Sequence, residues 1–334
     1  MKTLRGAIIG YGNVAAEAHL PGFRGAKGFA LAAVVDPSEE RRAAAAAALP
    51  EARVVADLAG LEGVRLDFVD VATPPAFHAE NVIAALERGW HVLCEKPLAI
   101  DTAAAVEVAD AARRTGKTVF TVHNWKYAPL FQRLRGLVTR GAVGEVREIE
   151  WRVLRPNPPA GATVGGRSWR VDRNVAGGGI LADHGWHAFY LMQFLFGRAP
   201  RSVTGRVWNE RPGELEVEDS AEVTLDFDGA AARLFFTWAA AERRTSGRVR
   251  GSGGTIEISD DALEIRPDDR DPQTLRFAPS IAASSYHPEW LPSLLEDFRA
   301  EVLHLDRRGR NLAEALCCAE MLAAGYASNG TAIE

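Results

Sequence analysis

The sequence predicts two domains of different class: an α/β domain with a parallel sheet at residues 1–122, and an α+β domain with a large, mostly antiparallel open sheet at residues 123–334. Strand-like and helix-like segments alternate in the first domain, which is typical of a parallel sheet covered by helices. From about residue 146 strand-like segments follow one another with turns between them, which favours antiparallel pairing. The 334 residues suffice for two full cores.

The elements of the first domain are predicted from apolar runs and helix-forming stretches. The expected strands are 5–9, 29–35, 54–56, 67–72, 90–94 and 118–122. The expected helices are 38–49, 78–88 and 101–116. Gly89 follows the helix 78–88, and Gly116 ends the helix 101–116. Glycine is common at the C-terminal end of helices. Because ligands bind at the carboxyl ends of parallel strands, we expect the site at the residues that follow these strands.

The second domain is predicted from alternating segments and a few helices. The expected strands are 146–154, 202–209, 221–228 and 231–239, with shorter ones near 246–258 and 262–266. The expected helices are 129–140, 188–196, 290–304 and 311–327. In the strand 231–239, Phe235 alternates with Leu234 and Phe236, so both faces carry large apolar groups. We therefore expect another subunit to cover one face of this sheet.

Composition excludes several classes of protein. The net charge of −5 argues against a nucleic-acid partner. No apolar run approaches the length of a membrane span, and the chain enters its first strand without a signal peptide, so we expect no membrane partner. The three cysteines, Cys94, Cys317 and Cys318, lack metal-ligand spacing and a disulfide framework. These observations favour a cytoplasmic protein.

A glycine pair follows the first apolar strand. Gly10 permits a tight turn, and Gly12 has no Cβ, so a pyrophosphate can approach the backbone. The helix expected to begin here would favour that anion through its free N–H groups, and Ala15 supplies the third small position. This pattern predicts a Rossmann domain, although a glycine turn without a ligand has the same sequence.

The second strand ends in Asp36, near the spacing at which a carboxylate meets the ribose hydroxyls of NAD. A carboxylate at this point repels a 2′-phosphate, so the sequence predicts NAD as the cofactor. Asp36 could instead cap the following helix, which has Pro37 at its first turn. Arg41 and Arg42 keep NADP as the less favoured alternative.

Lys96 lies just past a strand end, between Glu95 and Pro97. At the mouth of a nucleotide crevice its charge would stabilise negative charge that develops on a reacting oxygen during hydride transfer. A surface lysine paired with Glu95 is the alternative.

The densest polar stretch is 177–187, in which three glycines precede Asp183 and His187. The glycines would let the backbone pass close to a ligand. Asp183 and His187 share one helix face at their spacing, and an acid beside an imidazole orients the ring for abstraction of a hydroxyl proton. Asp183 could instead cap the helix, and His187 could be a hydrogen-bonded core residue. With His184 they make too thin a set for a metal, so we expect none.

These motifs together resemble the Gfo/Idh/MocA oxidoreductases, the family of glucose–fructose oxidoreductase and inositol dehydrogenase. The markers are Gly10-x-Gly12 with His19 and Pro21, Asp36, Thr73-Pro74 with His78, Glu95-Lys96-Pro97, and Gly177-Gly178-Gly179 with Asp183-x-Gly185-x-His187. The resemblance covers nearly the whole chain. It implies NAD(P), no metal, a catalytic set of Lys96, Asp183 and His187, and dimers or tetramers formed through the open C-terminal sheet.

The predicted site follows from these motifs and the resemblance. The cofactor-binding residues are Gly10, Tyr11, Gly12, Asn13, Val14, Asp36, Thr73, Pro74, His78, Glu95 and Lys96. The substrate residues are Lys96, Asn124, Trp125, Arg152, Trp169, Arg170, Asp183 and His187. Tryptophan faces stack on sugar rings and arginines bind carboxylate or phosphate, which favours an anionic or polyhydroxylated small molecule. A solvated basic loop with core tryptophans fits the stretch 151–173 equally well.

The chain departs from the family pattern at three places. Pro75 stands where many members have asparagine, and His123 begins a segment unlike the usual one. The acid that often follows the histidine is absent, with Tyr190 nearby. We expect an NAD-dependent oxidoreductase that transfers hydride between nicotinamide and a secondary alcohol or ketone of a sugar, cyclitol or derivative. The alternatives are an NAD-dependent glycoside hydrolase on the same scaffold and a non-catalytic NAD-sensing regulator.

Overall fold

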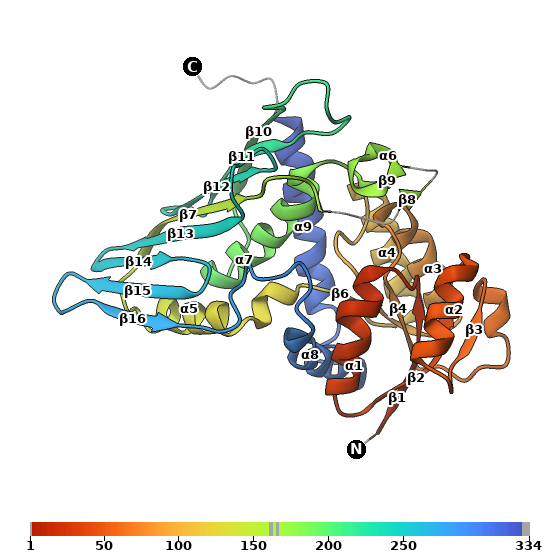
Figure 1. The fold of residues 1–334 in the computed structure, drawn as a ribbon. Coiled ribbons are helices and arrows are strands. Elements are labelled where there is room, and N and C mark those ends of the chain that lie inside the picture. The colour runs from red at the N-terminus through yellow and green to blue at the C-terminus, as the bar shows by residue number, and fades with distance from the viewer. Residues whose placement is uncertain (1, 160–162, 165–166, 329–334) are drawn as a thin grey trace. The chain divides into compact units, whose positions relative to one another are not determined.

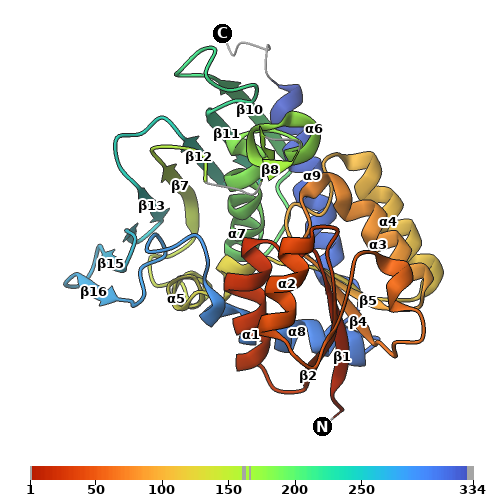
Figure 2. The ribbon, with the colours of Figure 1, turned by 45° about the vertical axis from the view of Figure 1, so that its right-hand side comes forward.

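The computed structural model describes residues 2–159, 163–164 and 167–328. The chain forms two compact units. Unit 1 comprises residues 1–124, 161–169 and 286–316, and unit 2 comprises residues 125–160, 170–285 and 317–334. Figure 1 labels the elements of both units, and Figure 2 shows them from a second side.

Unit 1 contains a six-stranded sheet in which all pairs are parallel, with strand order β3-β2-β1-β4-β5-β6. The strands are β1 (Leu4–Ile9), β2 (Phe29–Val35), β3 (Arg53–Val55), β4 (Phe68–Val71), β5 (His91–Cys94) and β6 (Val119–Thr121). They are short apolar runs with most side chains buried, as expected of a parallel sheet covered on both faces. The predicted Rossmann architecture is thereby confirmed.

The helices of unit 1 connect these strands and close the unit. They are the π-helix η1 (Ala15–His19), α1 (Leu20–Gly25), α2 (Glu39–Ala48), α3 (His78–Glu87), α4 (Thr102–Thr115), α8 (Leu291–Leu303) and the 3₁₀ turns η2 (Leu58–Leu61), η3 (Pro75–Phe77) and η7 (Pro288–Trp290). Ser38 and Asp101 cap α2 and α4 through their side chains, and Gly116 ends α4 in the left-handed conformation. The predicted helix boundaries are therefore set by local chemistry.

Residues 286–316 were expected in the second domain, but they cluster with unit 1. Phe298 of α8 packs against Phe29 and Phe68, with ring centroids 6.3 Å and 5.5 Å away. A Cβ built on Gly22 of α1 would lie 2.5 Å from the Cβ of Leu291, so the two helices touch closely. Helix α8 therefore completes the core of the nucleotide-binding fold.

Unit 2 contains an eight-stranded sheet of order β10-β11-β12-β7-β13-β14-β15-β16. The strands are β7 (Val146–Leu154), β10 (Ser202–Trp208), β11 (Ser220–Asp226), β12 (Ala231–Thr237), β13 (Arg244–Gly251), β14 (Gly254–Ile258), β15 (Ala262–Pro267) and β16 (Gln273–Arg276). All pairs are antiparallel except β12 with β7. The prediction of a mostly antiparallel sheet is confirmed, although the polar strand β16 was missed.

One face of this sheet is buried under helices. The helices of unit 2 are η4 (Asn124–Tyr127), α5 (Pro129–Thr139), η5 (Trp169–Val171), α6 (Arg173–Ala176), the π-helix η6 (Leu181–Gly185), α7 (Trp186–Phe196) and α9 (Arg310–Ala327), of which η4, η5 and α9 also extend into unit 1. Phe131 of α5 packs on Trp151 of β7 at 5.5 Å, and a Cβ on Gly205 of β10 would lie 2.5 Å from the carbonyl oxygen of Gly325. Figures 1 and 2 show α5 and α7 beside this face.

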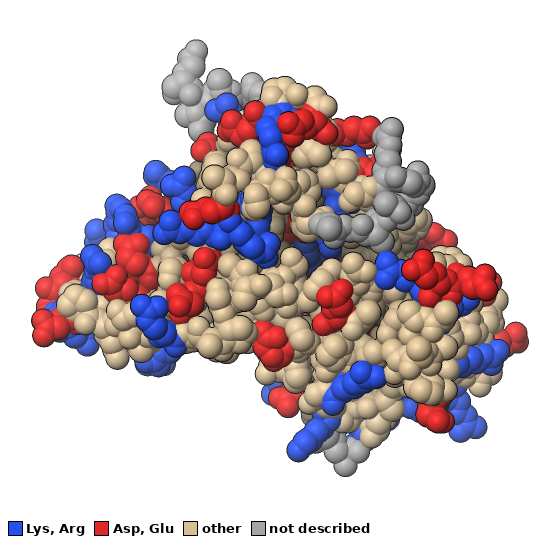
Figure 3. All heavy atoms as spheres, in the orientation of Figure 1, with Lys and Arg blue, Asp and Glu red and all other residues tan. Residues whose placement is uncertain are grey.

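The other face of the sheet carries charged and polar side chains. Glu150, Arg152, Arg248 and Glu257 line a depression of about 540 Å³ on it. Figure 3 shows Lys or Arg and Asp or Glu intermixed over the β13–β16 part of the surface, rather than gathered by sign. The two-residue strands β8 (Thr163–Val164) and β9 (Arg167–Ser168) form a separate small sheet in unit 1.

Candidate active site

The glycine turn after β1 has an open side. Gly10 has φ +89°, in the left-handed region, and a Cβ there would lie 2.9 Å from Thr73 Cγ2. Both the backbone and the close approach of Thr73 therefore require glycine at this position. A Cβ on Gly12 would meet nothing within 4 Å. The space above Gly12 is open, as a bound phosphate group needs.

Asp36, at the end of β2, is joined to this turn. Its Oδ2 accepts a hydrogen bond from the Tyr11 amide at 2.7 Å, and its Oδ1 accepts one from Ser38 N at 2.8 Å. Each carboxylate oxygen retains a further acceptor position. Arg41 Nη1 donates to Asn13 Oδ1 at 3.1 Å, and Arg42 Nη1 donates to the carbonyl oxygen of Asp36 at 2.9 Å. Both arginines that kept NADP under consideration have local partners beside Asp36.

Three other residues that the sequence predicts to bind the cofactor are Tyr11, Val14 and Pro74. The Tyr11 side chain is buried in a core cluster with Ile8 and Val34. Val14 precedes the π-helix η1, and Pro74 precedes the 3₁₀ turn η3. Only the main chain of Tyr11 belongs to the surface of the turn, because its ring fills the core.

His78 was predicted to contact the cofactor, but its two ring nitrogens bind main-chain oxygens. Nδ1 lies 2.7 Å from the Pro97 carbonyl oxygen, and Nε2 lies 2.7 Å from that of Thr73. The ring is fully buried, and burial lowers the pKa of His78. In this arrangement His78 ties together the two loops that carry Thr73 and Lys96.

Glu95 is held by a buried histidine. His19 Nε2 lies 3.0 Å from Glu95 Oε1, and His19 Nδ1 lies 2.8 Å from Asp70 Oδ2. Burial alone lowers the pKa of His19, but the charges and hydrogen bonds of Asp70 and Glu95 outweigh burial and raise the pKa to about 10. Glu95 Oε2 also accepts a hydrogen bond from the amide of Lys96 at 2.9 Å. His19 therefore anchors the segment that carries Lys96.

Two glycines of the 177–179 stretch are required by atoms that pack directly on them. A Cβ on Gly178 would lie 2.0 Å from the Tyr326 hydroxyl, and a Cβ on Gly179 would lie 2.0 Å from the Glu218 carbonyl oxygen. The sequence predicts that a ligand approaches this backbone. The close contacts of Glu218 and Tyr326 account for both glycines without one.

Glu218 binds consecutive amides at the start of η6, and sequence reasoning missed it. Its Oε1 accepts from Gly179 N at 2.8 Å, Leu181 N at 3.2 Å and the Tyr326 hydroxyl at 2.7 Å. Its main-chain oxygen accepts from Ile180 N at 3.1 Å. The side chain is buried, and burial raises the pKa of Glu218. No local signal marks this glutamate, because its partners lie about forty and one hundred residues away.

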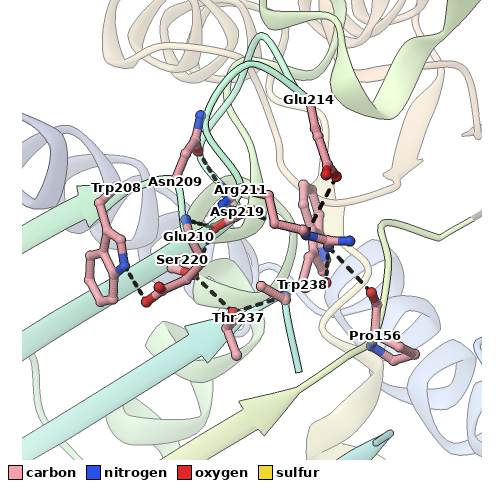
Figure 4. A network of polar contacts seen from close by, with 11 residues as sticks. Pro156, Trp208, Asn209, Glu210, Arg211, Glu214, Asp219, Ser220, Thr237 and Trp238 are labelled. Atoms are coloured by element: carbon pink, nitrogen blue, oxygen red, sulfur yellow. Dashed lines mark hydrogen bonds and ion pairs between the residues drawn. The ribbon is translucent and has the colours of Figure 1, made fainter. Parts of the chain in front are cut away.

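The neighbouring Asp219 holds a second loop (Figure 4). Its carboxylate accepts hydrogen bonds from the amides of Glu210 and Arg211, at 2.9 Å and 3.2 Å. Arg211 Nη2 in turn donates to the carbonyl oxygens of Trp238, at 2.6 Å, and Pro156, at 3.3 Å. Glu218 and Asp219, just before β11, thus hold two segments of the chain. Glu218 binds the glycine stretch, and Asp219 acts through Arg211 on the loop that follows β7.

Asp183 lies among positive charges. Its Oδ1 is 3.6 Å from Arg170 Nη1, and it interacts electrostatically with Arg155 and Arg243. Arg155 is fully buried, its guanidinium donates to Leu154 O, Arg244 O and Thr245 Oγ1, and burial lowers the pKa of Arg155 to about 10.

His187 contacts two aromatic residues. Its Nδ1 lies 2.6 Å from the Tyr190 hydroxyl. Its ring stacks on that of Trp125, with centroids 5.0 Å apart and planes at 20°. The amide of Trp125 donates to the Tyr190 oxygen at 3.2 Å. Trp125, which the sequence predicts as a substrate residue, therefore packs against the ring of His187.

The other predicted substrate residues are distributed as follows. Arg152 lies on the charged face of the sheet, where its guanidinium is 5.2 Å from the centre of the Phe235 ring. The adjacent Trp151 points to the buried face. Lys96, Asn124 and Trp169 belong to unit 1, and Trp125, Arg170, Asp183 and His187 belong to unit 2. Arg152 is the one predicted residue of unit 2 that the sheet separates from Asp183 and His187.

No group of three or more His, Cys, Asp or Glu residues within the described ranges is arranged to hold a metal ion. Over the same residues, no helix is long and apolar enough to cross a membrane.

The parallel sheet, the open glycine turn and the carboxylate at the second strand end define a dinucleotide-binding fold. A family model described as "Oxidoreductase family, NAD-binding Rossmann fold" matches residues 4–123, and the Gfo/Idh/MocA C-terminal domain matches residues 131–257. The chain belongs to the Gfo/Idh/MocA family. Both the predicted family and the predicted NAD-binding oxidoreductase are confirmed.

Several known proteins are similar to this chain. D-glucoside 3-dehydrogenase of Escherichia coli (strain K12) is 34% identical over 241 residues, which cover 67% of each chain. The 1,5-anhydro-D-fructose reductase of Ensifer adhaerens is 30% identical over 258 residues, 75% of this chain and 74% of that protein. The crystal structure of GenD2 from gentamicin A biosynthesis in complex with NAD has a TM-score of 0.82 at 26% identity, covering 99% of this chain and 95% of that one.

The residues of unit 1 fit NAD. The open space above Gly12 accommodates a phosphate, and Asp36 retains acceptor positions for ribose hydroxyls. When bound, NAD supplies the acceptor or donor of hydride.

Proposed function

We propose that the protein is an NAD-dependent oxidoreductase that interconverts a secondary alcohol and a ketone on a sugar, cyclitol or sugar derivative. The observation that carries this proposal is that a chain of this family retains Lys96, Asp183 and His187 together. A regulator that only senses NAD has no need for this set. The main chain of the glycine turn would bind the pyrophosphate, and Asp36 would accept hydrogen bonds from the adenosine ribose.

We assign separate roles to the reacting residues. Lys96, on the segment anchored by His19 and Glu95, would hold the substrate oxygen and stabilise negative charge on it. His187 would bind the same oxygen, and Asp183 would bind a neighbouring hydroxyl. Lys96 or His187 would exchange the proton with the substrate oxygen, and the bound NAD would supply the hydride acceptor or donor.

The substrate class is supported by the relatives and by charge. Relatives are named for a glucoside, an anhydrofructose and scyllo-inositol, all of which are polyhydroxylated rings. The guanidinium of Arg170, 3.6 Å from Asp183, would bind an acidic substituent beside the reacting hydroxyl. We therefore include uronic acids among the candidate substrates.

We also propose a homodimer or homotetramer assembled through the open face of the eight-stranded sheet. Half-buried Phe235 and the depression lined by Glu150, Arg152 and Arg248 lie on this face. Side chains of both signs on one surface are self-complementary, as a two-fold interface requires. Sedimentation equilibrium of wild type and Phe235→Glu tests this assembly. A monomeric wild-type protein would refute it.

The function is tested by following NADH absorbance with a panel of sugars, inositols and uronic acids, using NAD and NADP in parallel. For the substrate that reacts, Lys96→Met and His187→Ala should each lower kcat by about 10²-fold or more while NAD affinity stays near that of wild type. Unchanged turnover in either variant would remove that residue from the proposed set. Cleavage of a glycoside without net NADH would replace the dehydrogenase with the NAD-dependent hydrolase.

A further inference from the structure

The partner of His187 Nδ1 is a tyrosine that sequence reasoning left without a role. Tyr190 follows His187 by one turn of α7 and is fully buried. Its hydroxyl oxygen lies 2.6 Å from His187 Nδ1 and accepts the amide hydrogen of Trp125 at 3.2 Å. Tyr190 is therefore bound on one side by main chain and on the other by the imidazole.

The geometry indicates the direction of the bond between Tyr190 and His187. Hydrogen bonds donated by O–H are typically about 2.7–2.8 Å long, and those donated by N–H about 2.9–3.0 Å. The distance of 2.6 Å therefore favours the tyrosine hydroxyl as the donor. The Trp125 amide can only donate, so it takes up a lone pair of the tyrosine oxygen. The hydroxyl hydrogen of Tyr190 must therefore point away from that amide.

We infer that Tyr190 is a positioning residue that donates its O–H to Nδ1 of His187, so that the neutral imidazole carries its proton on Nε2. This inference deepens the proposed function and rests on it for its catalytic consequence. A ring protonated at Nε2 binds the substrate oxygen as a donor and cannot remove a proton from it at that nitrogen. In alcohol oxidation the bound NAD would supply the hydride acceptor, and the Lys96 amine would take the O–H proton as the alcohol becomes a ketone.

Trp125 holds both members of this pair. Its indole stacks on the His187 ring while its amide binds Tyr190. The indole is itself packed against Phe131 and Trp151, with ring centroids 5.9 Å and 6.4 Å away. The stacked Trp125 indole thus fixes the plane of the imidazole, and the bond to Tyr190 fixes the direction in which Nδ1 points. Such confinement selects one tautomer before any substrate binds.

The tautomer can be measured without a substrate. Long-range ¹H–¹⁵N spectra of the ¹⁵N-labelled full chain distinguish the protonated and unprotonated ring nitrogens of its eight histidines, and His187→Gln identifies the signals of His187. We expect Nε2 to be protonated above the pKa of the ring. In Tyr190→Phe we expect a mixture of tautomers or protonation at Nδ1. A wild-type ring protonated at Nδ1, or a Tyr190→Phe ring unchanged from wild type, would overturn the inference.

A kinetic readout separates this role from a purely structural one. Without the donor to Nδ1, part of the neutral ring would carry its proton on Nδ1 and lose the Nε2 donor to the substrate oxygen. Tyr190→Phe should therefore lower kcat several-fold with little change in KM. NAD affinity and the thermal midpoint serve as controls, because a structural defect lowers these as well. An unchanged kcat would contradict the assignment. Failure of every substrate in the panel would refute the proposed function and leave the NMR test intact.

Discussion

Replacing Asp36 with alanine should exchange the cofactor preference of the enzyme. The carboxylate is almost fully buried and already accepts the amide hydrogens of Tyr11 and Ser38, so its position relative to the glycine turn is well defined. Hydrogen bonds from a ribose hydroxyl to a charged acceptor contribute about 1.5–3 kcal/mol each. Loss of one such bond predicts NAD binding weakened by about 10- to 150-fold.

The effect on NADP has the opposite sign. A 2′-phosphate about 5 Å from the Asp36 carboxylate would experience repulsion of roughly 3 kcal/mol per unit charge at an effective dielectric constant of about 20. Alanine removes this repulsion. It also leaves Arg41 and Arg42, whose partners are Asn13 and nearby main-chain oxygens, beside the new phosphate. We expect NADP to bind on the order of 100-fold more tightly than in wild type.

The assay is equilibrium titration of NAD and NADP, by calorimetry or tryptophan fluorescence, and it requires no substrate. Asp36→Asn is the matched control, because it keeps the size and one acceptor oxygen but removes the charge. It should lose less NAD affinity than alanine and still improve NADP binding. Equal NAD affinities for wild type and Asp36→Ala, with unchanged thermal midpoints, would refute the placement of Asp36 at the ribose.

Two further predictions concern the supports of the site. Glu218→Ala should destabilise unit 2 by several kcal/mol, because the amides of Gly179 and Leu181 and the Tyr326 hydroxyl lose a buried acceptor and each unsatisfied group costs about 1–3 kcal/mol. Glu218→Gln keeps the acceptor oxygen and should cost far less; urea unfolding that ranks the two variants equally would contradict this account. Folding raises the pKa of His19 from 6.5 to about 10, so its contribution to stability is complete below pH 6.5 and is lost as the pH rises toward 10. Chemical unfolding between pH 6 and 10 should show a loss on the order of a few kcal/mol that His19→Gln flattens, and parallel curves for the two proteins would count against the buried ion pairs.

Much of the nucleotide-binding fold was predictable because its signals are local. Gly10 needs a left-handed backbone, Asp101 caps the helix that follows it, and apolar runs of parallel-strand length are buried on both faces. Gly116 likewise marks the end of its helix. The boundaries that these residues indicate agree with the structure to within a few residues.

The second unit was less predictable because its decisive contacts are long-range. Strand β16 has no apolar alternation, and it is defined by its pairing with β15. Arg152 and Trp151 are adjacent in a tryptophan-rich and arginine-rich stretch, yet the alternation of a strand places them on opposite faces of the sheet. A basic stretch therefore does not by itself identify the residues that face a substrate.

Residue types at short spacings were sufficient to predict the cofactor class and to select Lys96, Asp183 and His187, since a turn, a cap or a strand end depends on neighbours in the chain. The supports of these residues came only from folding. Glu218 accepts hydrogen bonds from Gly179 and Tyr326, and Tyr190 accepts one from the Trp125 amide, all between residues far apart in the sequence. The three glycines before Asp183 illustrate the difference: their pattern indicated a close approach, but only the packed chain shows that Glu218 and Tyr326 make it. A local pattern can require room for an atom, whereas three-dimensional packing specifies which atom occupies that room.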